Sequence, residues 1–238
     1  MIAFLQIDST AQVASNIANT AEQLAAKPEL SVIDIVFSGG IAGQTIMAVI
    51  FIMLFFAIYL YFERLLAINA ASKIDANFMN NIKLNIIKGR IDAAKLLCAQ
   101  TNSPVARLIE KGISRIGKPL ADIHTAIENA GKLEVYKLEK NVSMLATISG
   151  AGPMTGFLGT VVGMVIAFHK MAESGNNKIE MSTLSEGIYT AMMTTVVGLI
   201  VGIIAYVGYN HLVSKTDKIV NQMEANVVEF LDLLNEPT

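Results

Sequence analysis

Three long stretches of this 238-residue chain contain no charged side chain. They run over residues 35–62, 141–168 and 187–210. About 20 apolar residues in a helix are enough to cross the hydrocarbon core of a bilayer, so each stretch could span a membrane. One such stretch could be a buried helix of a soluble protein. Three of them in one short chain predict an all-α integral membrane protein with three transmembrane helices.

The composition agrees with this class and argues against several others. Hydrophobic residues make up 53% of the chain and charged residues only 16%, whereas a soluble domain usually carries about 25% charged residues. The net charge of −2 does not suit a protein that binds nucleic acid. Cys98 is the only cysteine, which excludes an internal disulfide, and we interpret it as an apolar filler. No Cys/His cluster suggests a metal site, and we expect neither a cofactor nor an enzymatic activity.

The distribution of lysine and arginine predicts how the chain crosses the membrane. The segment between the first two spans carries 13 of the 18 basic residues, and cytoplasmic loops are enriched in Lys and Arg. We therefore predict that the N-terminus lies outside and the C-terminus inside. The expected segments are an outer lead segment (1–33), a first span (34–62), a helical cytoplasmic segment (63–141), a second span (142–168), a short outer turn (169–186), a third span (187–210) and a cytoplasmic C-terminal helix (211–238).

The segment between the first two spans is predicted to be helical, with breaks. Apolar residues from Ile82 to Ala94 recur at helical spacing. Pro104 marks a break, because the residue before a proline avoids the helical region, and Ser103 can cap the helix that follows. Gly117 and Pro119 predict a second break.

Two of the transmembrane helices are expected to extend far beyond the membrane. From Leu120 onwards the sequence is compatible with one helix that runs straight into the second span. The third span likewise continues into the tail, where apolar residues keep a helical stripe as far as Leu231. Together with the shorter helices these extensions would form a helical cytoplasmic domain.

Glycine recurs in the second span, where residues 150–164 read GAGPMTGFLGTVVGM. A phosphate-binding loop needs a lysine directly after its last glycine, but none follows before Lys170. On a helix the glycines advance by three or four residues and form one face almost without side chains. Close packing of small residues drives helix association in lipid. We predict that this face and its counterpart in the third span pack against other helices or a partner, through Pro153, Gly156, Gly159, Gly163, Gly198 and Gly202.

Thr160 and Thr195 lie within these two faces at similar depth. A membrane threonine often only bonds its hydroxyl back to a carbonyl one turn earlier, and the sharper hypothesis is a polar lining for a hydrated path. Ion translocation generally uses an ionisable group near mid-membrane, and the spans contain none. If this protein moves protons, the carboxylate that carries them must come from another chain. The predicted lining is Thr160, Thr195, Thr194 and Thr190, with Glu186 as an acid at the outer entrance.

Several motifs are similar to those of one family. GPMTGFLGTVVGMVIAF (152–168) closely resembles the second-span signature of the MotA/TolQ/ExbB proton-channel family, and TAMMTTVVGLIVGIIAYVGYN (190–210) resembles its third-span signature. FERLLAI (62–68) resembles its exit from the first span. SPVARLIEKGI (103–113) and KLEVYKLEKNVSMLATI (132–148) are similar to its cytoplasmic segment. Length and three-span topology favour the ExbB/TolQ branch over the four-span MotA branch.

The resemblance implies a motor subunit in the inner membrane of a Gram-negative bacterium. It implies a pentamer of this chain around a dimer of a single-span partner of ExbD/TolR type, whose aspartates carry the protons, and a TonB-like protein that transmits the work. It places Thr160 and Thr195 at two pore-facing threonines and Pro153 at a helix-breaking proline. Some relatives have a glutamate where this chain has Thr190, so the resemblance supplies no intramembrane carboxylate from this chain.

Other functions stay open at this point. A TolQ-like subunit for envelope maintenance would share all these motifs, and hydroxyl groups serve sodium as well as protons. A passive scaffold would use the small-residue faces only to dock helices. A self-contained channel is disfavoured, because the spans carry no ionisable residue and the chain has no inverted repeat.

Overall fold

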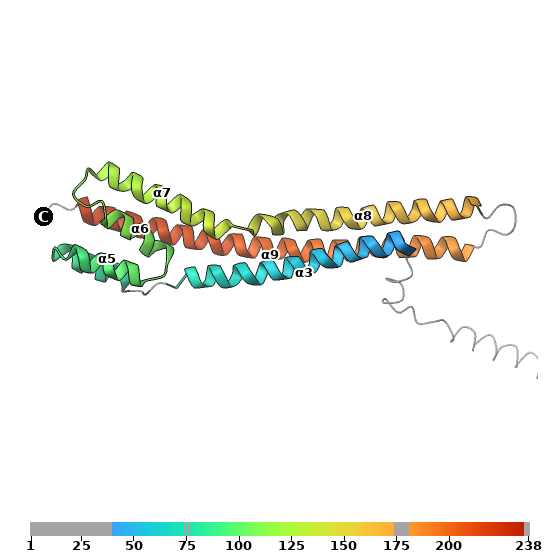
Figure 1. Cartoon of the computed structure of the whole chain (residues 1–238), viewed down its shortest axis with the longest axis horizontal. Coiled ribbons are helices and arrows are strands. Elements are labelled where there is room, and N and C mark those ends of the chain that lie inside the picture. The colour runs from blue at the N-terminus through green and yellow to red at the C-terminus, as the bar shows by residue number, and fades with distance from the viewer. Residues whose placement is uncertain (1–39, 74, 76, 174–180, 236–238) are drawn as a thin grey trace, which may run out of the picture.

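The computed structural model describes residues 40–173, except 74 and 76, and residues 181–235. The predicted lead segment, residues 1–33, lies outside the described residues. Within them the secondary structure is helical and contains no strand, which confirms the predicted all-α class (Figure 1). The helices are α3 (Gly40–Ala71), α4 (Phe78–Ile87), α5 (Ile91–Gln100), α6 (Pro104–Ile113), α7 (Leu120–Glu139), α8 (Val142–Glu173) and α9 (Met181–Asn235).

Three helical stretches are long and apolar enough to cross a membrane: Ile41–Ala71 of α3, Leu120–Glu173, which includes α8, and Gly187–Asn235 of α9. These helices expose large apolar side chains in several directions, such as Phe55 on α3, Phe157 on α8 and Ile203 on α9. A helix that is apolar all round must be covered by lipid or by other helices. The three-span prediction is therefore confirmed, while the segment boundaries predicted from the sequence stay predictions.

The molecule is elongated, with a different set of helices at each end (Figure 1). At one end α8 and α9 lie side by side and α3 packs across both. At the other end α6 and α7 pack against the second half of α9, and α5 packs against α6. One continuous core joins the two ends, from Ile50 on α3 to Phe230 on α9. The 55-residue helix α9 runs through both ends and holds them together.

The expectation of one unbroken helix from Leu120 into the second span is wrong. Helix α7 ends at Glu139 and α8 begins at Val142. Asn141 between them has a φ of 64°, in the left-handed region, where asparagine is the commonest residue after glycine. The third span does continue without a break, so only one of the two long extensions is a single helix.

The stretch from Ile82 to Ala94 also divides into two helices, α4 and α5, where the sequence pattern indicated continuous helical spacing. Gly89 has a φ of 68° and turns the chain between them. The first and last residues of this stretch, Ile82 and Ala94, are nevertheless both buried, because the turn keeps them on the side of the core. The predicted break at Pro104 is confirmed: the Ser103 hydroxyl oxygen accepts a hydrogen bond from the Ala106 backbone N–H at 3.2 Å and caps α6.

Candidate ion-pathway site between helices α8 and α9

Helices α8 and α9 approach so closely that their contact requires glycine. A Cβ atom added to Gly156 would lie 2.8 Å from the backbone carbonyl oxygen of Thr194, and one added to Gly198 would lie 2.7 Å from that of Gly152. Real Cβ atoms do not approach backbone atoms at such distances. Gly159 and Gly163 lie in the same contact, each within reach of an α9 side chain. The two small-residue faces therefore meet each other within one chain, by the close packing typical of membrane helices.

Pro153 lies inside α8 and contributes to this contact from one side. A Cβ on Gly202 would come within 2.6 Å of the proline ring, so the ring fills the space that this glycine leaves open. Proline has no N–H, so the Ser149 carbonyl one turn earlier lacks its usual helical donor. That carbonyl oxygen faces Gly202 on the neighbouring helix. The proline thus frees a backbone acceptor without ending the helix.

Three threonine hydroxyls gather around the Gly156 carbonyl, where a bare backbone leaves room for them. Thr195 Oγ1 donates to this oxygen across the helix contact at 3.1 Å, and Thr194 Oγ1 does so at 3.1 Å. Thr160 Oγ1 lies 3.3 Å from the same oxygen, one turn away on its own helix. The hydroxyls of Thr160 and Thr195 also hydrogen-bond directly to each other. We call Thr160, Thr194, Thr195 and the Gly156 carbonyl the threonine cluster.

The cluster combines bonds within a helix and bonds between helices. Thr194 Oγ1 lies 2.7 Å from the Ala191 carbonyl of its own helix as well as reaching α8. Thr155 behaves differently: among the residues that the structure describes, its hydroxyl bonds only back to the Ala151 carbonyl, at 2.8 Å. Thr160 and Thr195 therefore differ from Thr155, because they bond to each other across two helices and not solely to a carbonyl one turn earlier.

Exposure differs among the predicted lining residues. Thr194 and Thr190 are buried, at 2% and 9% exposure, whereas Thr160 and Thr195 are half-buried at the rim of the helix contact. The rim hydroxyls are the ones a neighbouring helix or water could reach. Glu186 belongs to α9, but its side chain lies outside the described residues.

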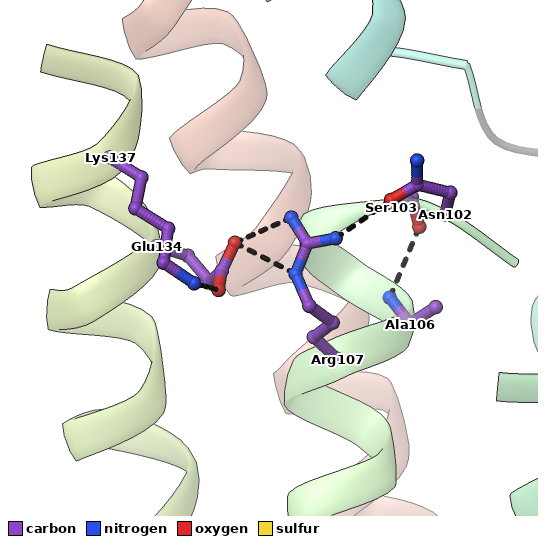
Figure 2. A network of polar contacts seen from close by, with 6 residues as sticks. All are labelled: Asn102, Ser103, Ala106, Arg107, Glu134 and Lys137. Carbon is purple, nitrogen blue, oxygen red and sulfur yellow. Dashed lines mark hydrogen bonds and ion pairs between the residues drawn. The ribbon is translucent and has the colours of Figure 1, made fainter. Parts of the chain in front are cut away.

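A second polar cluster lies between α6 and α7, and the sequence pattern gave no sign of it. Glu134 is 5% exposed, and one of its carboxylate oxygens accepts hydrogen bonds from Arg107 Nε at 2.9 Å and from its Nη2 at 2.6 Å (Figure 2). Lys137 donates to the other oxygen at 2.6 Å. Asn102 accepts from the remaining guanidinium nitrogen at 3.0 Å. This network clamps α7 to the N-terminal half of α6.

The charges around Glu134 determine its protonation. Burial alone would raise the pKa of this carboxyl, but hydrogen bonds from Arg107 and Lys137, with their positive charges, outweigh burial and lower the pKa below its usual value of 4.5. Glu134 is thus a carboxylate at neutral pH. Charge-assisted bonds of this kind are among the strongest in proteins, and the cluster has the character of a structural clamp.

The fold and the threonine cluster define a class: a multi-pass membrane protein in which hydroxyl groups line the close contact between the described parts of α8 and α9. Residues 100–225, more than half of the chain, match the MotA/TolQ/ExbB proton channel family. The chain belongs to this family, as its motifs indicated. The matched region runs from the end of α5 through most of α9, and it contains both polar clusters.

Individual relatives carry both ExbB and TolQ names. The Tol-Pal system protein TolQ of Haemophilus influenzae is 27% identical over 225 residues, which cover 86% of this chain and 92% of that protein. The biopolymer transport protein ExbB of Helicobacter pylori is 36% identical over 80 residues, 34% of this chain and 54% of the relative. A Methanothermobacter thermautotrophicus protein named as a putative ExbB homologue is 26% identical over 136 residues, which cover 57% of this chain and 47% of that protein. The chain thus spans about half the length of two of these relatives.

Proposed function

We propose that this chain is an ExbB-like subunit of an inner-membrane motor driven by the proton-motive force. Several copies form a ring, a pentamer by family resemblance, around a dimer of a single-span partner of ExbD/TolR type. The partner contributes a carboxylate, and Thr160 and Thr195 solvate it as it takes up and releases protons. The observation that supports this role most directly is the hydrogen bond between these two hydroxyls, which lie half-buried in otherwise uncharged spans.

The physical case depends on the cost of charge in the membrane. An ionised aspartate at the centre of a helix in a bilayer costs about 2.5–3.5 kcal/mol by insertion scales. Moving one charge through 100 mV supplies about 2.3 kcal/mol, so the two energies are comparable. A hydroxyl can both donate and accept a hydrogen bond. Thr160 and Thr195 could therefore stabilise an incoming carboxylate and also pass a proton to it.

The contacts of α8 and α9 narrow down where a partner helix would bind. The glycine faces are already occupied by each other, so a partner would meet the rim of the contact, where Thr160 and Thr195 are half-buried. Large exposed apolar side chains such as Phe157 and Met192 flank the same helices, and in the proposed ring they face lipid or neighbouring helices. Orientation follows the basic residues, with the α4–α7 end in the cytoplasm and the α8–α9 connection in the periplasm.

Two cellular roles are compatible with such a motor subunit. The ExbB-like proposal couples the motor to a TonB-like protein and outer-membrane transport. A TolQ-like role in envelope maintenance is the second candidate, and the alignment with Haemophilus influenzae TolQ, which covers 92% of that protein, favours it specifically. Deleting the gene and measuring TonB-dependent uptake and detergent sensitivity separately distinguishes them: loss of uptake supports the first and a leaky envelope the second.

Reconstitution with the single-span partner tests the ion-pathway role. Proton uptake into vesicles is compared for the parent chain, for Thr160→Val with Thr195→Val, and for the control Thr155→Val, whose hydroxyl bonds only within α8. We expect the double variant to lose most of the flux and the control to keep it. If all three chains give equal flux, the threonines do not line the path, and the scaffold function is favoured instead.

A further inference from the structure

The membrane-distal end of the molecule carries opposite charge on its two edges. Figure 1 shows α5 and α7 on opposite edges of this end, with α6 and α9 between them. Residues 77–100, which form α4 and α5, contain four basic side chains and one acidic. Helix α7 together with residues 215–235 of α9 contains eight acidic and four basic side chains. We call residues 77–100 the basic edge, and α7 together with the adjoining second half of α9 the acidic edge.

The basic side chains of the basic edge are exposed except for Lys83, which is half-buried, and they form no ion pair with the residues that the structure describes. They are Lys83, Lys88, Arg90 and Lys95. Large apolar side chains lie among them: Ile87 is 64% exposed and Leu96 is 60% exposed. Apolar side chains exposed within a charged rim are typical of a surface that binds another protein.

The acidic edge contains a groove of matching character. The groove has a volume of about 650 Å³ and lies between α7 and α9, with α6 at its base. Its apolar lining includes Val220, Met223 and Val227 on α9 and Tyr136 on α7, and Tyr136 is 71% exposed. Its charged lining is His124, Glu128, Lys132, Glu139 and Glu224.

Two of these acids are available to a partner. Lys132 is already paired with Glu128 at 2.8 Å. Glu139 and Glu224 form no ion pair among the residues that the structure describes. The groove therefore offers an apolar floor and two unpaired carboxylates at its sides, which complement an apolar surface with lysines around it.

We infer that the acidic edge of one copy of this chain binds the basic edge of the next copy. Both halves of the contact are present on one chain, on opposite sides of the same end, and this is the requirement for a head-to-tail interface. Repetition of such a contact closes a ring when the rotation between copies closes, and otherwise builds a filament. Electrostatic complementarity also fixes register and rejects wrong partners. The inference deepens the ring of the proposed function, on which it rests, by naming the surfaces that join its subunits outside the membrane.

Cross-linking between differently tagged full-length copies tests the contact. In a Cys98→Ala background, copies with Leu96→Cys are co-expressed with copies carrying Tyr136→Cys, and membranes are treated with a flexible bis-maleimide. We expect a mixed dimer containing both tags, and a ladder of multimers when one chain carries both cysteines. The matched control replaces Tyr136→Cys by Gln222→Cys, which is exposed on α9 outside the groove and should give little product.

Charge reversal then tests the complementarity itself. We expect Lys95→Glu to lower the mixed dimer about fivefold, the size of one exposed charge pair, and Glu224→Lys in the other copy to restore it. The inference would be overturned if the mixed dimer does not form, or if the Gln222→Cys control gives the same yield. It would also be overturned if Glu224→Lys does not restore the dimer that Lys95→Glu has weakened. These results are independent of proton uptake. A ring joined only through the membrane helices would conduct protons without forming these cross-links, and a ring that conducts no protons could still form the cross-links.

Discussion

The hydroxyl groups of Thr160 and Thr195, 35 residues apart in the sequence, hydrogen-bond to each other across the contact of α8 and α9. Thr195 also reaches the backbone carbonyl of Gly156, which is accessible because no side chain covers the helix there. The glycines and the threonines therefore depend on each other. The glycines allow α8 and α9 to approach closely, and this close approach brings the two hydroxyl groups within hydrogen-bond distance. Predictions about either set can be tested separately.

Enlarging a glycine of the contact should separate the helices. Gly156→Leu places a side chain where even a Cβ would lie 2.8 Å from a backbone oxygen, so we expect a loss of stability of about 3 kcal/mol or a failure to fold. Gly150→Ala is the matched control, since a Cβ at that position meets nothing within 4 Å. Thermal unfolding in detergent measures both. A Gly156→Leu chain as stable as the control would show that the two helices do not make this contact.

Removing the carboxylate of Glu134 should loosen α6 from α7. Glu134→Gln removes the negative charge that Arg107 and Lys137 share, and we expect it to cost about 2 kcal/mol, less than a fully buried pair because Arg107 can regain water. Glu128→Gln, at an exposed pair with Lys132, should have a smaller effect. Denaturant unfolding of the two variants compares them. Equal losses would mean that burial of Glu134 adds nothing to its bonds.

The same carboxylate predicts a direction for the effect of pH. The pKa of Glu134 is lower in the folded chain than its usual value of 4.5, so the unfolded chain binds more protons as the solution becomes acidic. Its contribution to stability is fully present above pH 4.5 and is lost as the pH falls through the folded pKa. The stability difference between the parent and Glu134→Gln should therefore shrink on acidification, and a difference that grows would contradict the clamp.

The break at Asn141 gives a prediction about backbone conformation. Its φ of 64° lies in the left-handed region, which asparagine tolerates well and which is unfavourable for alanine by about 1–2 kcal/mol. Asn141→Gly should keep the stability of the parent, and Asn141→Ala should lose about 1 kcal/mol. The comparison is made by thermal unfolding. An alanine variant that is more stable than the glycine variant would indicate that α7 and α8 join into one helix, as the sequence pattern alone suggested.

Cys98 should be unreactive in the folded chain. It is 2% exposed, and burial, with a smaller contribution from Glu110, raises its pKa to about 12. Because the thiolate is the reactive form, we expect maleimide labelling only after unfolding. Rapid labelling of the folded protein would mean that the core around α5 opens.

The sequence predicted the helix contact better than it predicted helix ends. The spacing of Gly156, Gly159 and Gly198 indicated bare faces, because small residues at helical period inside a membrane are typical of close helix packing. It could not say that the faces cover each other, since any small-residue face fits any other. The break at Asn141 was missed because one residue in the left-handed region leaves the apolar pattern intact. The pair of Arg107 and Glu134, 27 residues apart, depends on how α6 lies against α7.

The central claim is tested most directly by proton flux through the reconstituted complex, compared between variants that keep and variants that remove the hydroxyl groups at positions 160 and 195. Thr160→Ser with Thr195→Ser retains both hydroxyls, and Thr160→Val with Thr195→Val removes both at nearly the same volume. We predict that the serine chain conducts close to the parent rate and that the valine chain is slower by about tenfold or more, the effect of losing one hydrogen bond to a charged group. Equal flux through the serine and valine chains would contradict the account.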